Sequence, residues 1–305
     1  MKTPKISVVM TAYNAENHIG QAIESILNQT FANFEFIIIN DGSTDSTAEM
    51  ISSFVDSRIQ FINNKRNQGL TAMLNQGFDL AKGEYIARMD ADDISLPERF
   101  AKQVAFMDAN PDTGVLGTWF QNFGADDAIC EHIANVSILD LLQGCQICHP
   151  SAMLRKSMFD KHDLRYSLEC LTAQDYELWS RAVRVMKIAN LQEVLLRYRW
   201  HETNVSIKRM NSQKSTALRV QQNILDFLTN DERLRKSISA MFGIGGLKTK
   251  TKLFGFITLM TTFHYGPNSE SKEYFLFGFI PAVRITKNRV YACHYIPFAK
   301  TKINV

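Results

Sequence analysis

The stretch that decides the fold is Glu84–Phe100, which reads EYIARMDADDISLPERF. An apolar run, Tyr85–Ala87, leads into three carboxylates, Asp90, Asp92 and Asp93, before a new helix is expected to begin. Carboxylates this close repel one another, so a fold that gathers them at a strand end needs a positive charge there. The stretch therefore predicts a buried strand whose carboxyl end carries a functional site.

The segments before this stretch alternate between strand and helix patterns. Strands are predicted at 6–13, 34–41, 59–64 and 84–89, and helices at 18–27, 43–55 and 70–83. The second of these strands, FEFIIIND, is apolar on both faces, as buried parallel strands are. The alternation predicts an α/β protein with a doubly wound, mostly parallel sheet, helices on both faces, and a ligand crevice at the carboxyl ends of the strands.

Beyond about residue 110 the pattern becomes less regular. Strands are expected at 113–124 and 193–201, and helices at 174–186 and 211–228. After residue 240 the string LFGFI occurs twice, at 253–257 and 276–280, which is a short internal repeat. We predict a catalytic domain over residues 1–208 and a helical, basic C-terminal extension over residues 209–305.

Bulk properties exclude some classes of protein. The chain has 305 residues and a net charge of +3, which is too small to indicate a nucleic-acid partner. Its N-terminus lacks the apolar core of a signal peptide, and no stretch approaches the ~18 apolar residues of a membrane-spanning helix. Five cysteines form no repeated framework, which suits a reducing compartment. A cytoplasmic location is expected.

The C-terminal tail has its own charge pattern. Between residues 245 and 305 it carries Lys or Arg at positions 248, 250, 252, 272, 284, 287, 289, 300 and 302, against Glu270 and Glu273. Apolar segments flanked by basic residues can lie on an anionic membrane surface. An ordinary extension that packs on the catalytic domain, or that forms a dimer contact, explains the pattern equally well. Peripheral membrane association therefore stays open.

One cysteine pattern, CQICH at Cys145–His149, matches the haem-attachment string C-x-x-C-H. Covalent haem attachment belongs to exported proteins, and a zinc site needs a second pair of ligands at matching spacing. Reduced, partly buried thiols are the expected state of these cysteines.

Polar residues follow every predicted strand in the first half of the chain. They include Thr11 to Asn14, Asn40 and Asp41, Arg66, and the acidic group of the opening stretch. Helix capping explains some of them, and we expect caps at Thr44 and at Ser95, the latter with Glu98 in a capping box. One helix start uses one cap, so capping leaves Asp41 and the acidic group unexplained.

The sequence contains no known glycine-rich phosphate-binding loop for the predicted crevice. No G-x-G-x-x-G follows the first strand, and the P-loop pattern is absent too. A divalent cation held by carboxylates is the alternative way to bind a diphosphate. The D-A-D of residues 90–92 places two carboxylates two residues apart, so that one can bind a ribose and the other a metal ion.

Together these motifs resemble the family 2 glycosyltransferases, which are inverting enzymes that use nucleotide sugars and have the GT-A fold. The resemblance rests on SVVMTAYNAENHIGQAIESILNQT, IINDGSTDST, NQGLTAMLNQGFDLAKGEYIARMDADD, HPSAMLR and AQDYELW, and covers residues 5–206. It implies a UDP-sugar donor and Mn²⁺ or Mg²⁺ as cofactor. The implied acceptor is a glycan or lipid-linked glycan of lipopolysaccharide, O-antigen or capsule synthesis.

The resemblance also implies roles for residues of the donor site. Thr11, Ala12 and Tyr13 correspond to the wall around uracil and its nucleoside. Asp41 corresponds to the carboxylate that accepts a hydrogen bond from the uracil edge. Arg66 is expected near the base or the diphosphate.

The remaining roles concern the sugar transfer itself. Asp90 corresponds to the residue that binds the ribose, Asp92 to the metal ligand, and His201 to a histidine that reaches the metal or diphosphate. Asp175 resembles the general base, which removes the proton of the acceptor hydroxyl. The family usually has Glu-Asp here, whereas this chain has Gln174 before Asp175, which puts in doubt an acceptor-binding role for the first position.

Two rival functions fit the sequence less well. A non-catalytic binding or scaffold protein of the same fold would not need to keep Asp41, Asp90, Asp92 and Asp175. A sugar-1-phosphate nucleotidyltransferase would need a loop rich in glycine and arginine after the first strand, and TAYNAEN does not supply it. A metal-dependent glycosyltransferase is the function that the sequence favours.

Overall fold

The structure is a computed structural model that describes residues 3–124, 126–201, 210–242, 244, 282–286 and 289–293. By its contacts the chain divides into two compact units, residues 1–136 with 144–217, and residues 137–143 with 218–305. The first unit holds the large sheet and all of the predicted site residues. Both copies of LFGFI lie outside the described residues.

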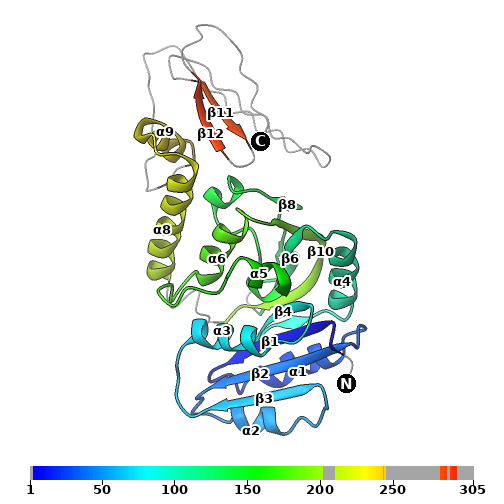
Figure 1. Ribbon diagram of the computed structural model, residues 1–305. Coiled ribbons are helices and arrows are strands. Elements are labelled where there is room, and N and C mark those ends of the chain that lie inside the picture. Colours follow the sequence, from blue (N-terminus) through cyan, green and yellow to red (C-terminus); the bar gives the residue numbers. More distant parts are fainter. Residues whose placement is uncertain are drawn as a thin grey trace. The chain divides into compact units, whose positions relative to one another are not determined.

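The first half of the sheet is parallel and comes from the N-terminal strands. These are β1 (Ile6–Ala12), β2 (Phe34–Asp41), β3 (Ile59–Asn64) and β4 (Tyr85–Asp90), in the order β3-β2-β1-β4 (Figure 1). The four predicted strands are confirmed. Register places Thr11 beside Asp90 and Ala12 beside Asn40, so the polar strand ends meet at one edge.

The second half of the sheet is mixed. Strand β9 (Met153–Arg155) runs antiparallel to both β4 and β6 (Thr113–Phe123), and β10 (Lys187–Arg199) runs parallel to β6. Short strands β7 (Ile129–Cys130) and β8 (Asn135–Val136) pair with β6 and β10. Strand β5 (Ile94–Ser95) pairs antiparallel with β10, which brings the end of β10 back to the acidic loop.

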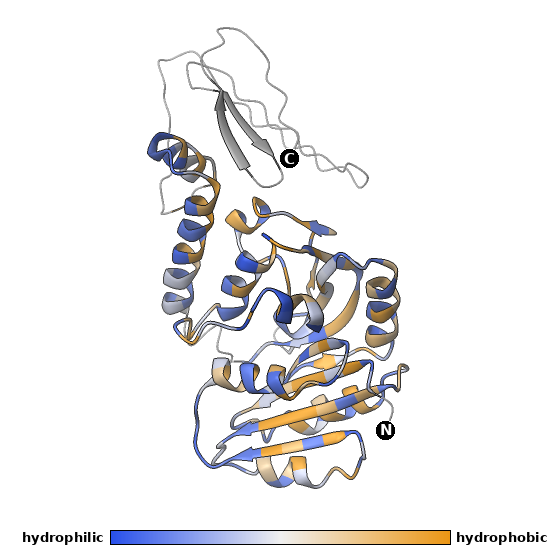
Figure 2. Ribbon diagram, in the orientation of Figure 1, coloured by the Kyte–Doolittle hydropathy of each residue, from blue (hydrophilic) through white to orange (hydrophobic). Residues whose placement is uncertain are grey.

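Helices pack on the sheet through apolar stripes. They are α1 (Ile19–Leu27), α2 (Thr47–Ser52), α3 (Leu70–Leu80), α4 (Arg99–Ala109), α5 (Lys156–Lys161) and α6 (Gln174–Ala182), with a 3₁₀ turn η2 at His149–Ser151. Helix α1 buries Ile19, Ala22, Ile23 and Ile26, the spacing of one helical face. Strand β2 is hydrophobic along most of its length and hydrophilic at its carboxyl end (Figure 2).

The two predicted helix caps are wrong. Ser95 lies in β5, where its hydroxyl accepts a hydrogen bond from the Gln29 side chain at 3.1 Å, and α4 begins only at Arg99 without a side-chain cap. Helix α2 begins at Thr47, and the backbone N–H of Thr44 donates to Asn14 instead, at 2.9 Å. The Thr44 hydroxyl also donates to Asn14 Oδ1, at 3.4 Å, so in both places a tertiary hydrogen bond uses the side-chain group that the local pattern assigned to a cap.

The second unit contains the 3₁₀ turn η1 (Asp140–Gln143), helix α9 (Glu232–Phe242) and a hairpin of β11 (Ala282–Thr286) and β12 (Arg289–Cys293). The predicted helix at 211–228 is confirmed as α8 (Met210–Leu228), whose later part belongs to this unit. Gln221 on α8 donates to the Leu142 carbonyl in η1 at 2.9 Å. Among the described helices, none has the length and apolar composition needed to cross a bilayer.

Candidate active site

The acidic loop lies between β4 and β5, at the carboxyl edge of the parallel strands. One carboxylate oxygen from each of Asp90, Asp92 and Asp93 lies within 4.8 Å of the others. Asp93 is buried, at 1% exposure, whereas Asp90 and Asp92 are half-buried. Burial raises the pKa of Asp92 and Asp93, and the negative charge of Asp90 raises both further.

The end of β10 contacts this loop through hydrogen bonds. The backbone N–H of Arg199 donates to Asp93 Oδ1 at 2.8 Å, and its Nε donates to the carbonyl of Asp92 at 2.7 Å. His201 follows, with Nε2 at 3.0 Å from Asp92 Oδ2. Its ring lies 5.1 Å from the ring of His18, which precedes α1. The structure thus brings the two expected metal ligands, Asp92 and His201, together.

A buried arginine supports the loop from within the sheet. Arg88 on β4 is 3% exposed and forms an ion pair with Asp90 through its terminal guanidinium nitrogen. Burial acts against its charge, but Asp90 and then Asp93 raise the pKa of Arg88 above its ordinary value. Its guanidinium remains positive.

These residues fit a divalent cation. The donors are carboxylate oxygens, the ligands that Mg²⁺ and Mn²⁺ prefer. Asp93 Oδ2 is buried and accepts no hydrogen bond from the described residues. The guanidinium groups of Arg88 and Arg199 lie beside this group of three carboxyl groups. A bound cation would add positive charge that stabilises the ionised forms of Asp92 and Asp93.

The expected donor wall lies along the end of β1. Thr11 and Ala12 are buried, at 9% and 2% exposure, while Tyr13 is 51% exposed just beyond the strand. An exposed ring at the carboxyl edge is available for stacking against a planar ligand. Because Thr11 pairs with Asp90, this wall and the acidic loop are neighbours.

Asp41, at the end of β2, holds the loop that leads into α3. Its two carboxylate oxygens accept the backbone N–H groups of Gln68 and Gly69, each at 2.8 Å. Each oxygen retains a further lone pair, so the carboxylate can accept another donor. Asp41 therefore has an observed structural role beside its expected contact with the base.

Arg66 lies in the same loop and is exposed. The backbone of Arg66 packs against Gly42, where an added Cβ would lie 2.6 Å from the carbonyl carbon of Arg66. Gly42 also has a φ of +69°, a conformation that favours glycine. The geometry places Arg66 beside Asp41, and its side chain makes no ion pair with the described residues.

Asp175 occupies the first turn of α6, after Ala173 turns the chain with a φ of +49°. It is half-buried, and burial raises the pKa of its carboxyl above the ordinary value. Opposing effects come from the positive charge of Arg88, which lowers this pKa, and the negative charge of Asp90, which raises it. Asp175 therefore binds its proton more tightly than an exposed aspartate does.

The CQICH segment lies next to Asp175. Cys145 Sγ lies 3.9 Å from Asp175 Oδ2, and His149 Nε2 lies 2.8 Å from the Tyr166 hydroxyl. Burial raises the pKa of Cys145 and Cys148 well above the ordinary thiol value, so both are protonated thiols. None of Cys130, Cys145, Cys148 and Cys170 takes part in a disulfide bond.

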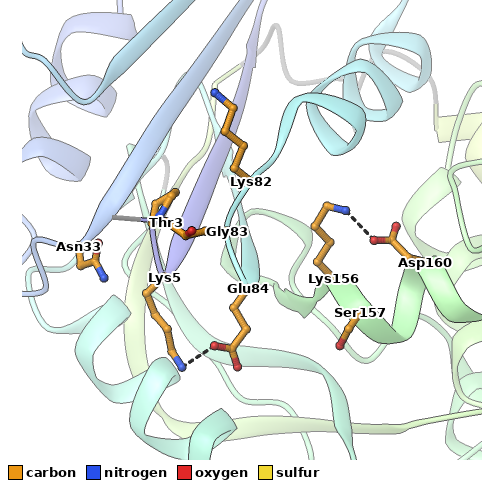
Figure 3. A pocket seen from close by; sticks show the side chains of 10 residues that line it. Thr3, Lys5, Asn33, Lys82, Gly83, Glu84, Lys156, Ser157 and Asp160 are labelled. Carbon is orange, nitrogen blue, oxygen red and sulfur yellow. Dashed lines mark hydrogen bonds and ion pairs between the residues drawn. The ribbon is translucent and has the colours of Figure 1, made fainter. Parts of the chain in front are cut away.

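A separate hollow of about 580 Å³ lies at the opposite, amino end of the strands (Figure 3). Lys5 pairs there with Glu84 at 2.7 Å, and Lys156 with Asp160 at 2.6 Å. Because four of its five charged side chains pair with one another and Lys82 is the fifth, this hollow offers little net charge to a ligand.

Sequence reasoning missed Arg88 and Arg199. The signal for Arg88 was present, since a charged residue inside YIARMD interrupts a strand that is otherwise buried. Arg199 had no comparable signal, because its role depends on the pairing of β10 with β5.

Comparison with known proteins identifies the family. Residues 7–163 match the family described as Glycosyl transferase family 2. The chain is 32% identical over 242 residues to an uncharacterized glycosyltransferase of Haemophilus influenzae, covering 74% of this chain and 75% of the relative. It is 37% identical over 215 residues to EpsE of Bacillus subtilis, covering 68% of this chain and 76% of that relative. The chain belongs to glycosyl transferase family 2, and its predicted class as a glycosyltransferase is confirmed.

A third relative has a named reaction. It is the Escherichia coli UDP-Glc:alpha-D-GlcNAc-diphosphoundecaprenol beta-1,3-glucosyltransferase WfgD, 27% identical over 228 residues, covering 74% of this chain and 87% of the relative.

Solved structures confirm the GT-A fold class. S. aureus TarS in complex with UDP-GlcNAc superposes with a TM-score of 0.65 at 19% identity, covering 82% of this chain and 76% of that chain. The mannosyltransferase PcManGT of Pyrobaculum calidifontis, in complex with GDP-Man and Mn²⁺, gives a TM-score of 0.59 at 13% identity, covering 80% and 70%. At these identities the likeness concerns the fold.

Proposed function

We propose that this glycosyltransferase moves one sugar from a UDP-sugar to a hydroxyl of a glycan acceptor, with inversion at the anomeric carbon. The acceptor oxygen forms a bond to that carbon as the bond to UDP breaks, and Asp175 takes the hydroxyl proton. The observation that carries the proposal is the acidic group Asp90, Asp92 and Asp93 at the carboxyl ends of the parallel strands, with Asp92 Oδ2 3.0 Å from His201 Nε2. In the proposal this group serves the leaving diphosphate, and Asp175 serves the attacking hydroxyl.

The donor side is assigned to the strand ends. Tyr13 offers its exposed ring to the base, and Thr11 and Ala12 line the nucleoside beside it. Asp41 accepts from the base edge, Asp90 accepts from the ribose hydroxyls, and Arg66 reaches the base or diphosphate.

Asp92 and His201 would hold a Mn²⁺ or Mg²⁺ ion, and Asp93 would support these two ligands. When bound, that ion supplies positive charge that stabilises the departing diphosphate. The chain's own contribution is to fix the ligands, because Arg199 holds the loop through Asp92 and Asp93.

Asp175 acts in the proposal as the general base that removes the proton of the acceptor hydroxyl. A general base must be ionised to accept a proton, so activity falls as the pH falls through its pKa. Burial raises that pKa, so the acid limb of the pH profile should lie higher than for an exposed aspartate. A base of this kind contributes roughly 10²–10⁴ in rate.

The acceptor class is taken from the relative that acts on a diphosphoundecaprenol-linked sugar. We assign this chain to lipopolysaccharide, O-antigen or capsule synthesis. Because such acceptors reside in the cytoplasmic membrane, the proposal includes peripheral association through the basic tail.

The test is a donor screen on the full chain with Mn²⁺ present, scoring nucleotide release from UDP-glucose, UDP-galactose and their N-acetyl forms. GDP-mannose is included because a structural neighbour binds it. Release of UDP that requires an acceptor supports the proposal. Release from GDP-mannose alone would overturn the donor assignment.

The Asp175→Asn variant tests the base. We expect transfer to fall by about 10²-fold or more, with metal-dependent UDP binding nearly unchanged by calorimetry. Glu177→Gln, on the same helix turn but paired with Arg181 at 2.7 Å, is the matched control and should retain turnover. Full turnover by Asp175→Asn would remove Asp175 from the base role.

A further inference from the structure

The CQICH segment contacts the helix that carries Asp175 at two points. Cys145 Sγ lies 3.9 Å from Asp175 Oδ2, in the first turn of α6. The ring of His149 lies 6.2 Å from the ring of Trp179, one turn further along α6, with the two planes at 68°. Residues four apart share one face of a helix, so Asp175 and Trp179 lie on the same side of α6. The segment therefore packs along the face of α6 that presents the expected base.

His149 is buried and hydrogen-bonded. It is 9% exposed, and its Nε2 lies 2.8 Å from the hydroxyl of Tyr166, which is itself buried. The rings of these two residues also meet edge to face, with 5.6 Å between their centres. Burial, and then the positive charge of Arg88, lower the pKa of His149 well below its ordinary value, so the imidazole is neutral. A neutral imidazole and a hydroxyl form a directional hydrogen bond, which fixes the orientation of the His149 ring.

Tyr166 is in turn held by α3. Its backbone N–H donates to Asn75 Oδ1 at 3.0 Å, and Asn75 Nδ2 donates to the Tyr166 carbonyl at 2.9 Å. Thr71, on the same helix, donates its hydroxyl to the Cys170 carbonyl at 3.2 Å. Because Tyr166 and Cys170 both belong to the loop between α5 and α6, α3 holds this loop at two points. The Tyr166 hydroxyl is thereby a fixed partner for His149.

Stability alone is a weak reason for a polar pair in this place. A buried hydrogen bond contributes only about 0.5–1.5 kcal/mol net, and replacing both partners by apolar groups of the same shape can be nearly neutral. Trp179 is fully buried, yet its Nε1 has no hydrogen-bond partner among the described residues. What a buried polar pair does supply is one defined orientation for the groups that pack on it. The group that packs on His149 is the helix of Asp175.

We propose that His149 is a positioning residue for Asp175. Held by Tyr166 and packed against Trp179, its ring fixes the start of α6, so that the carboxylate keeps one position toward the acceptor hydroxyl. Cys145 contacts the carboxylate itself and limits its rotation. A displacement of about 1 Å in a reacting group can lower a rate by about 100-fold, so this support matters for transfer. The inference rests on the proposed function, because it takes Asp175 as the general base.

The first test removes the hydrogen bond from either side in the full chain, through His149→Phe and Tyr166→Phe. Both variants keep an aromatic ring, and both should lower kcat by about tenfold, scored as UDP release with the donor and acceptor that the wild type uses. UDP binding with Mn²⁺, measured by calorimetry, should match that of the wild type, because the strand ends that carry the donor site are unchanged. His149→Gln, whose amide can still bond to the tyrosine hydroxyl, should recover part of the loss.

The matched control is His132→Phe. His132 is half-buried, and its ring also packs on an aromatic ring, that of Phe120 at 5.8 Å, but it lies in the segment before β8. This variant should leave kcat and UDP binding unchanged. Urea denaturation checks that every variant is folded under the assay conditions. If His149→Phe fails to fold, Tyr166→Phe, which removes only the hydroxyl oxygen, carries the same test.

A double-mutant cycle separates positioning from a general loss of structure. His149→Phe is combined with Asp175→Asn, and its effect on the residual turnover is compared with its effect in the wild type. A residue that acts through Asp175 has little further effect once that carboxylate is gone, so the two losses should be strongly non-additive. A loss of folded protein would instead lower the rate by the same factor in both backgrounds.

Three results would overturn the inference: wild-type kcat in both His149→Phe and Tyr166→Phe, an equal loss in the Asp175→Asn background, or a loss of UDP binding together with the loss of kcat. Failure of the proposed function gives a different result. In that case the wild type itself would transfer no sugar from any donor, or Asp175→Asn would keep full turnover.

Discussion

At the scale of single residues, the pair Asp92 and His201 joins two distant parts of the chain. Asp92 Oδ2 and His201 Nε2 lie 3.0 Å apart, and Asp92 belongs to a group of three carboxyl groups with Asp90 and Asp93. An imidazole nitrogen and a carboxylate oxygen at this separation are both metal-ligating atoms. In the proposed function they would bind the cation together.

We predict that Asp92→Ala removes the metal dependence of UDP binding. Without this carboxylate the cation loses a ligand, so titrations with and without Mn²⁺ should give the same UDP affinity. His201→Ala should weaken the metal effect in the same direction but less. The control is Asp79→Ala, because Asp79 is 71% exposed on α3 and lies in a surface ion pair. Undiminished metal-linked affinity in Asp92→Ala would contradict the assignment.

The residues that sequence predicted and the residues it missed differ in where their signal lies. Asp90, Asp92 and Asp93 are neighbours in sequence at the end of an apolar run, so their clustering followed from strand geometry alone. Asp175 needed the family resemblance, because a carboxylate in the first turn of a helix is otherwise an ordinary residue. Arg199 depends on a pairing between β5 and β10 that no local pattern encodes.

At the scale of elements, the loops after β1 and β2 hold each other. The N–H of Asn14 donates to Ser43 Oγ at 2.9 Å, and Asn14 Oδ1 accepts from the N–H of Thr44 at 2.9 Å. Asn14 has a φ of +48°, which asparagine tolerates better than most residues. The loop after β3 joins them through Asp41 and Gly42. The sequence placed each loop correctly but assigned Thr44 to a helix cap, which the structure does not show.

Glycine substitutions in these loops test this packing. Gly42→Ala combines a φ of +69° with a Cβ 2.6 Å from backbone, so we expect it to lower the free energy of unfolding by more than the ~1–2 kcal/mol of a left-handed residue. Gly69→Ala has a φ of +94° and nothing within 4 Å, so its loss should be smaller. Gly20→Ala, in α1 with ordinary contacts, should be neutral or stabilising. Urea denaturation measures all three, and equal stability of Gly42→Ala and Gly69→Ala would contradict the described packing.

Sheet topology shows the same limit of local reasoning. Strands β1 to β4 alternate with helices, so their parallel order followed from connection rules. Strand β9 has three residues and enters between β4 and β6 from a distant part of the chain. Its apolar residues carry no information about which strands it pairs with. The sequence pattern therefore could not predict the strand order in the mixed half of the sheet.

At the scale of the whole molecule, charge is distributed unevenly along the chain. The net charge is +3, while the tail from residue 245 onward carries nine basic residues against two acidic ones. The rest of the chain is consequently acidic. A basic segment at one end can therefore contribute membrane affinity that the catalytic unit does not, which is the form of association included in the proposed function.

We predict that the full chain binds vesicles containing anionic lipid, and that replacing Lys248, Lys250 and Lys252 by glutamate abolishes most of that binding. Each basic residue near an anionic surface contributes about 1 kcal/mol, and reversal adds repulsion to the loss of attraction. The control carries glutamate at Lys161 and Lys187 of the catalytic unit. Pelleting is measured with anionic and with neutral vesicles at low and at 0.5 M salt. Binding that is equal for both variants, or equal on neutral vesicles, would show that the tail does not act as a membrane contact. Retained UDP-sugar turnover in the tail variant would at the same time show that the catalytic unit is intact, so a loss of pelleting could be assigned to charge alone.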